Sequence, residues 1–167
     1  MKFSPTHNDN VMRAIYGILV LGGLVLFNIG EGLLKTVFMS VSLVFLATGL
    51  FLFIRFEMTS FTYILMENEK RLDFYVDRAV GKRGTYVCYF PLYDCVEFLD
   101  FTKEAKEELK KKYPRIVFFN YCHNKVGVKK QIMVFEADGT FEAVIIQLDE
   151  YKNYMKDAIK LSKKETE

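Results

Sequence analysis

Cysteine and histidine stand side by side at Cys122 and His123, within the stretch FFNYCHNK. The chain has three cysteines and two histidines in all, so this pair is a candidate for chemistry. An imidazole beside a thiol can generate a thiolate nucleophile, and thiolate and imidazole are also preferred zinc ligands. The pair therefore raises two hypotheses: a cysteine-dependent enzyme or redox sensor, and a zinc site.

The surrounding sequence argues against both hypotheses. The stretch has the composition of a β-strand, in which neighbouring side chains point to opposite faces, so Cys122 and His123 would face apart. Partners are scarce: His7 is distant, and six residues separate Cys88 from Cys95, where zinc ligand pairs typically have about two to four. We expect a buried Cys122, a histidine near the strand end, no catalytic residue, no metal and no cofactor.

Two uncharged apolar runs dominate the first third of the chain, separated by the segment GEGLLK. A helix rises about 1.5 Å per residue, so roughly 20 residues cross about 30 Å of hydrocarbon. Both runs approach this length, the first with its Arg13 head at the interface. We predict a transmembrane helical hairpin over residues 11–55, with helices at about 12–29 and 36–54.

Two alternatives compete with a membrane hairpin. A cleaved signal peptide would need a small-x-small site before the second run, and none is present. A soluble helix pair would be apolar on one stripe, whereas both runs are apolar around their circumference. Small residues could allow close helix approach within the hairpin or between protomers. They are Gly17, Gly22, Gly23, Ser40, Ser42 and Gly49.

Basic residues flank the two apolar runs, with Lys2 and Arg13 before the first and Arg55, Lys70 and Arg71 after the second. The positive-inside tendency then predicts a multi-pass protein of the plasma membrane with both termini in the cytoplasm. The three scattered cysteines form no CxxC motif, which is typical of a reducing compartment.

Beyond residue 56 the pattern changes to short strands. GKRG at residues 81–84 and Asp138-Gly139 are hairpin signals, and no Pro-, Gly- or Ser-rich linker precedes the strands. Seven segments are predicted as strands, at residues 60–66, 71–80, 85–90, 95–101, 115–123, 130–137 and 140–148.

Two segments are predicted as helices. Residues 103–113 contain good helix formers but few apolar residues, so we expect an exposed insertion. Residues 149–164 have Asp149 as an N-cap candidate and an apolar stripe that would cover the sheet. The stripe comprises Tyr151, Met155, Ala158 and Ile159.

Seven antiparallel strands followed by a closing helix resemble the plan of pleckstrin-homology (PH) domains. The segment YFPLYDCVEF resembles the stretch of bacterial PH-like domains in which the third strand ends in an apolar-Pro-Leu step before the fourth. Such domains often accompany a pair of transmembrane helices. The resemblance implies a mostly-β or α+β domain, as a seven-stranded barrel or split sheet. The domain organisation would be a cytosolic tail at 1–10, the hairpin at 11–55, the PH-like domain at 56–161 and a charged tail at 162–167.

The PH resemblance also draws attention to the basic residues of the first two hairpin loops, which bind lipid headgroups in eukaryotic PH domains. We therefore take Lys70, Arg71, Lys82 and Arg83 as candidates for binding anionic lipid or a partner; solvated turns are the alternative. Lys125, Lys129 and Lys130 form another basic turn, which we expect to be a solvated hairpin loop.

The function expected from these features is binding without catalysis. A net charge of +2 gives no case for nucleic acid. We predict a membrane-anchored binding or scaffolding module whose partners are the lipid bilayer, a protein or second copy of the chain, or anionic headgroups. The alternatives are an enzyme or redox sensor using Cys122, and a regulatory subunit of a transport assembly. The absence of charges within the apolar runs argues against an ion relay.

Overall fold

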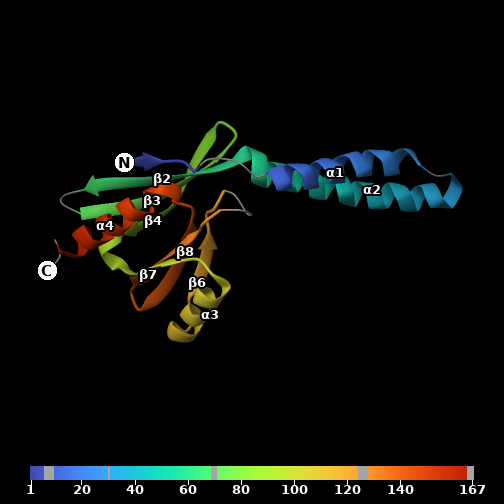
Figure 1. Cartoon of the computed structure of the whole chain (residues 1–167). Coiled ribbons are helices and arrows are strands. Elements are labelled where there is room, and N and C mark those ends of the chain that lie inside the picture. Colours follow the sequence, from blue (N-terminus) through green and yellow to red (C-terminus); the bar gives the residue numbers. More distant parts are fainter. Residues whose placement is uncertain (6–9, 30, 69–70, 124–127, 165–167) are drawn as a thin grey trace.

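The computed structural model contains a projecting two-helix hairpin and a domain of two β-sheets (Figure 1). It describes residues 1–5, 10–29, 31–68, 71–123 and 128–164. Along the chain the elements are β1 (Lys2–Phe3), α1 (Asn10–Asn28), α2 (Gly32–Phe53), the π-helical turn η1 (Ile54–Met58), β2 (Thr59–Asn68), β3 (Arg71–Val80), β4 (Arg83–Pro91), the 3-10 turn η2 (Leu92–Asp94), β5 (Cys95–Asp100), α3 (Lys103–Lys112), β6 (Val117–Asn120), β7 (Gln131–Ala137), β8 (Thr140–Ile146), the 3-10 turn η3 (Asp149–Tyr151) and α4 (Lys152–Lys164).

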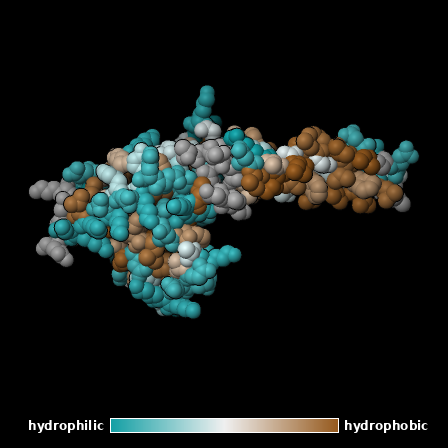
Figure 2. Space-filling view, viewed as in Figure 1, coloured by the Kyte–Doolittle hydropathy of each residue, from teal (hydrophilic) through white to brown (hydrophobic). Residues whose placement is uncertain are grey.

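The two N-terminal helices are long and apolar enough to span a membrane. At about 1.5 Å per residue, the 19 residues of α1 extend about 28 Å and the 22 residues of α2 about 33 Å. They pack on each other, and most of their residues are not buried inside the protein. Figure 2 shows this contrast between the hydrophobic hairpin and the hydrophilic domain.

Small residues allow α1 and α2 to approach closely. A Cβ atom at Gly23 would lie 2.9 Å from Leu46 Cγ, and one at Gly49 would lie 2.8 Å from Val20 Cγ2. The Ser42 hydroxyl donates a hydrogen bond across the hairpin to the Gly23 carbonyl at 2.7 Å. Close approach within the hairpin is thus confirmed at these positions.

The first sheet has the order β1-β2-β3-β4 and is antiparallel throughout. Its edge strand β1 comes from the segment that precedes the helices: Lys2 pairs with Ile64 and Phe3 with Tyr63. The expected N-terminal tail therefore contributes to the sheet. A two-residue strand is too short to produce an alternation pattern in the sequence.

The second sheet has the order β5-β7-β8-β6, and β6 lies parallel to β8. All seven predicted strands are present, but the prediction that all would be antiparallel is wrong. Helix α3 lies between β5 and β6, and a helical crossover allows β6 to join the far edge of the sheet in the parallel direction. Strand β6 is also shorter than predicted, because Arg115 has φ +70° and cannot continue an extended strand.

The predicted β7–β8 turn is confirmed, but the predicted cap of α4 is not. Asp138 and Gly139 have φ angles of +50° and +74° and connect β7 to β8 in the predicted two-residue turn. The prediction that Asp149 caps α4 is wrong. Its carboxylate instead accepts hydrogen bonds from the Gln147 side-chain amide at 3.0 and 3.3 Å. Helix α4 extends to Lys164, into the predicted charged tail.

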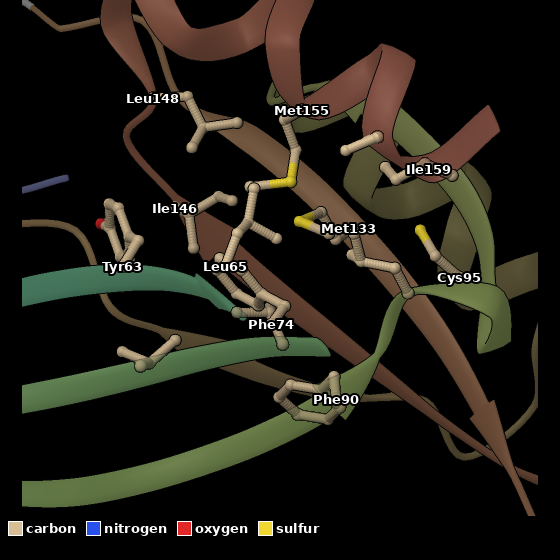
Figure 3. Close-up of a cluster of buried hydrophobic side chains, with 14 of the residues drawn as sticks. Tyr63, Leu65, Phe74, Phe90, Cys95, Met133, Ile146, Leu148, Met155 and Ile159 are labelled. Atoms are coloured by element: carbon tan, nitrogen blue, oxygen red, sulfur yellow. The ribbon is translucent and has the colours of Figure 1, made fainter. Parts of the chain in front are cut away.

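The second sheet is buried on both faces. On one face, Met133, Phe135, Val144 and Ile146 pack against the first sheet and α4, which contributes Met155, Ala158 and Ile159 as the predicted stripe requires. Figure 3 shows Met155 and Ile159 directed at Leu65, Met133 and Ile146. The opposite face buries a second cluster beneath α3, formed by Leu109, Cys122, Ile132, Val134, Ala143 and Ile145.

Helix α3 is therefore more than an exposed insertion, and that prediction is wrong. Leu109 is 2% exposed, and the Tyr113 ring lies 4.3 Å from the Phe141 ring, centroid to centroid. A short helix needs only these two large side chains to cover a small patch of sheet, so its low apolar content was misleading.

Replacing Gly49 with leucine should destabilise the hairpin, because the new side chain would overlap Val20. We expect a loss of about 1–3 kcal/mol in the free energy of unfolding in detergent micelles, followed by circular dichroism. Gly17→Leu is the control, since no atom lies within 4 Å of a Cβ at Gly17. Equal stability of the two variants would contradict close packing at Gly49.

Leu109→Ala should lower the stability of the domain by about 2–4 kcal/mol, because it leaves a cavity beneath α3. Leu161→Ala is the matched control, because Leu161 is 56% exposed on α4. Chemical denaturation monitored by tyrosine fluorescence measures both. A cost for Leu109→Ala no larger than that of the control would mean that α3 does not cover the sheet.

Candidate binding site at the junction of hairpin and domain

The helical hairpin enters the domain without a linker. Helix α2 continues through η1 directly into β2, and Thr59 Oγ1 at the start of β2 donates a 2.8 Å hydrogen bond to the Ile54 carbonyl. The β3–β4 turn closes over this point, where the Gly81 amide donates to the Met58 carbonyl at 2.9 Å. The end of α2 and the first sheet are thus parts of one hydrogen-bonded structure.

An ion pair joins α1 to the same junction. The guanidinium of Arg13 donates two hydrogen bonds to the Glu57 carboxylate, at 2.8 and 3.0 Å. The Tyr16 hydroxyl adds a third bond to Glu57 at 3.1 Å. Bidentate geometry of this kind fixes the orientation as well as the distance of the two groups. Arg13, expected at the end of the first apolar run, is tied to the base of α2.

Arg55 lies on the opposite side of the junction, against the second sheet. Its Nη2 atom donates a 3.3 Å hydrogen bond to the Cys122 carbonyl, and its guanidinium lies 5.4 Å from the ring centroids of Phe56 and Phe61. Its Nη1 atom is buried and has no hydrogen-bond partner within the described part of the chain. A buried guanidinium donor without an acceptor is costly to the fold.

A cavity of about 300 Å³ lies beside Arg55. It is formed where the last turn of α2 and η1 meet the segment that follows β6 and the residue before β7. Its walls combine two cationic side chains with apolar and aromatic ones. The lining residues are Phe51, Leu52, Arg55, Phe56, Asn120, Cys122 and Lys130.

The segment that forms the far wall is held by hydrogen bonds to the core. Asn120 Oδ1 accepts from the Cys122 amide at 3.0 Å, and the Tyr63 hydroxyl donates to the Tyr121 carbonyl at 2.8 Å. The Tyr121 amide donates to the Ile145 carbonyl at 2.9 Å. The cavity wall is therefore a defined backbone structure between β2, β8 and Arg55.

A larger open cleft of about 1060 Å³ lies at the same end of β7, between the end of β5 and the start of α4, and Lys130 lines both cavities. Its charged and polar groups already bind one another: Lys152 pairs with Asp100 at 2.7 Å, and Gln131 Oε1 accepts from the Leu148 amide at 3.2 Å. Because these groups are satisfied within the protein, this cleft is the weaker ligand site despite its size.

The sequence-predicted basic residues do not form one site. Lys70 lies outside the described residues. Arg71 begins β3 and lies 5.4 Å from the Tyr93 ring centroid, whereas Lys82 and Arg83 lie at the end of β3 next to the hairpin. Ten residues of strand at about 3.3 Å each separate these ends by about 30 Å. Of the predicted basic residues that the structure describes, only Lys82 and Arg83 lie at the end of the domain next to the α1–α2 hairpin, where Arg55 also lies.

Cys122 and His123 are both buried, with 3% and 4% exposure. Burial of Cys122 is confirmed, but the predicted alternation of these two residues is wrong, because β6 ends at Asn120. Burial raises the pKa of the Cys122 thiol to about 12, so it is protonated at neutral pH, the opposite of what a nucleophilic cysteine requires.

The cysteines of the hypothetical zinc site are also separated. Cys95 belongs to the core cluster beneath α4, and Cys88 packs at the edge of that cluster. Cys122 lies in the other cluster, beneath α3. The second sheet separates the two clusters. The described residues contain no group of three or more metal-ligating side chains.

Sequence reasoning missed the cavity. Arg55 was noted only for its charge, and Lys130 was expected in a solvated loop. The one usable signal was an arginine immediately after an apolar run of membrane length. That Asn120, Cys122 and Lys130 line the same cavity as Arg55 depends on the fold.

Comparison of the chain with known protein families, curated proteins and solved structures found no match. The PH-like resemblance therefore stays a prediction from residues and strand order.

The buried thiols should resist alkylation. At pH 8 we expect Cys122 in the folded chain to react at least about a hundredfold more slowly than in the urea-unfolded chain, measured by mass spectrometry of the labelled peptides. Half-buried Cys88, whose pKa burial raises to about 11, should react before Cys95 and Cys122. Rapid, selective modification of Cys122 would contradict a structural role.

The raised thiol pKa also sets a pH dependence of stability. The folded pKa of Cys122 lies above the ordinary value of 9.0, so burial of the protonated thiol contributes stability that is complete below pH 9 and lost as pH rises through about 12.

Proposed function

We propose that the chain is a membrane-anchored binding module without catalytic activity. The hairpin crosses the plasma membrane twice, and the N-terminal strand and the domain share the cytoplasmic side. The domain is PH-like and of bacterial type, and its hairpin end meets the anionic inner leaflet. Engagement of a protein partner or of a second copy of the chain stays a prediction of the sequence.

The observation that carries this proposal is the junction without a linker. Strand β1 precedes α1 and β2 follows α2, and both lie in the same sheet. A chain that leaves and re-enters one sheet through two antiparallel apolar helices must return to the side from which it started. The domain is thereby held at the bilayer surface, where its effective concentration towards membrane components is high.

The charge distribution supports the orientation. The hairpin end of the domain carries exposed Arg78 on β3 with Lys82 and Arg83 beside it, in addition to Arg55. The far end of the hairpin offers only Lys35, close to Glu31. Each basic residue near an anionic leaflet contributes about 1 kcal/mol, and the excess of such residues favours the cytoplasmic side.

The PH-like assignment is supported by the order of elements. The antiparallel strands β2, β3 and β4 of the first sheet are followed by the four strands of the second, and α4 then packs into the core between the sheets. The added strand β1 and the α3–β6 crossover depart from the resemblance, so they are the features to compare when a related structure is found.

The depth of the domain can be measured with fluorophores attached to the full chain in nanodiscs. Val80→Cys places a label beside the β3–β4 turn, and Met66→Cys places one at the far end of β2; both carry Cys88→Ser. A quencher on lipid headgroups should quench the Val80 label strongly and the Met66 label little. Equal quenching would contradict the proposal.

Anionic lipid should strengthen the quenching at Val80 if the basic turn contacts the leaflet. We expect this increase to fall in the Lys82→Gln/Arg83→Gln variant, and Arg71→Gln serves as the control at the far end. An increase that is unaffected by Lys82 and Arg83 would assign the effect to another surface.

A further inference from the structure

We propose that the cavity beside Arg55 binds the phosphate group of one anionic membrane lipid. Arg55 and Lys130 would hold the phosphate, and Phe51 and Leu52 would contact the glycerol and the first part of the acyl chains. The inference rests on the proposed function, because it requires α2 to span the bilayer. It adds a defined ligand class and a site that differs from the basic hairpin loops.

The cavity lies at the depth of lipid headgroups. Phe51 and Leu52 belong to the last turn of α2, and Arg55 follows within the next turn. Since α2 extends about 33 Å and the hydrocarbon layer is about 30 Å thick, its last turn lies at the boundary between acyl chains and headgroups. Arg13 and Glu57, an ion pair at the same junction, mark that boundary on the α1 side.

The chemistry of the walls matches a lipid phosphate. A guanidinium presents a planar set of donors that fits phosphate oxygens, and a lysine adds a second positive charge. Arg55 forms no salt bridge with any carboxylate that the structure describes. The neighbouring Arg78 guanidinium repels Arg55, so a bound anion would relieve that repulsion.

The shape favours a lipid over a soluble phosphate ester. A volume of about 300 Å³ is at the lower end of ligand pockets, with room for a headgroup but not for acyl chains. The apolar wall is continuous with the outer surface of α2, where Phe51 is 67% exposed. Acyl chains could therefore remain along the helix while the phosphate occupies the cavity.

Native mass spectrometry of the full chain, released from nanodiscs of mixed phosphatidylglycerol and phosphatidylcholine, tests the proposal. We expect one phosphatidylglycerol to be retained in preference to phosphatidylcholine. Arg55→Gln should weaken retention about tenfold through loss of charge-assisted hydrogen bonds. Leu52→Trp should weaken it comparably by filling the cavity while the guanidinium stays in place.

The matched control is Lys103→Gln/Lys111→Gln, which removes two exposed charges from α3 and none from the cavity or the β3–β4 turn. Retention should be unchanged in this variant. Equal loss in all three variants would overturn the proposal and assign the lipid to general surface charge. Circular dichroism on each variant tests folding, and Leu52→Trp decides the matter if Arg55→Gln fails to fold.

A second arm identifies the source of the phosphate. Inorganic phosphate or glycerol phosphate at millimolar concentration should leave the retained lipid in place; displacement would indicate a soluble ligand and overturn the lipid assignment. Absence of any preference for phosphatidylglycerol would also overturn it. If the Val80 label is quenched normally in that case, only the cavity assignment fails. If the Val80 label is also unquenched, the proposed function fails with it.

Discussion

The structure depends on how the chain satisfies its charged and backbone groups at the point where α2 meets the domain. At this point an apolar helix must become a β-strand, and backbone groups buried there without partners would be costly. The π-helical turn η1, the Thr59 hydroxyl and the β3–β4 turn supply the hydrogen bonds of the transition. The Arg13–Glu57 ion pair also ties α1 to this junction, so both helices and the first sheet are joined at one place.

The second sheet extends this constraint to the opposite side of the junction. Because it is buried on both faces, β7 and β8 carry continuous apolar runs, and α3 must cover the face turned away from α4. The crossover through α3 places β6 beside β8, and the chain after β6 then passes the end of α2. Residues Asn120 and Cys122 thereby meet Arg55, and the cavity results from the packing of the sheet as much as from the hairpin.

Periodicity predicted most of the elements but few of their long-range contacts. The two apolar runs, the seven strands and the stripe on α4 follow from local patterns that tertiary packing reinforces. The two-residue strand β1 and the parallel direction of β6 could not be predicted, because each depends on pairing between distant segments. The double burial of the second sheet was visible in runs such as QIMVF, which a sheet with one solvated face would not contain.

The candidate site illustrates the same limit. The sequence singled out Cys122 and His123 as a chemical pair, whereas the structure gives Cys122 a role in packing and its carbonyl a role in holding Arg55. Of the predicted basic residues, Lys82 and Arg83 lie at the hairpin end and Arg71 at the far end. A strand separates the two ends by its full length, which composition alone does not reveal.

The hydrogen bonds and the Arg13–Glu57 ion pair at the junction should hold the helical hairpin and the domain in one fixed orientation. The most direct test is the distance distribution between spin labels on Ile18 of α1 and Lys156 of α4, measured by pulsed electron paramagnetic resonance on the full chain in nanodiscs. We expect a single narrow distribution, which broadens when Glu57→Gln removes the charge that Arg13 binds. A broad distribution in the native chain would mean a flexible tether between hairpin and domain and would contradict a fixed junction.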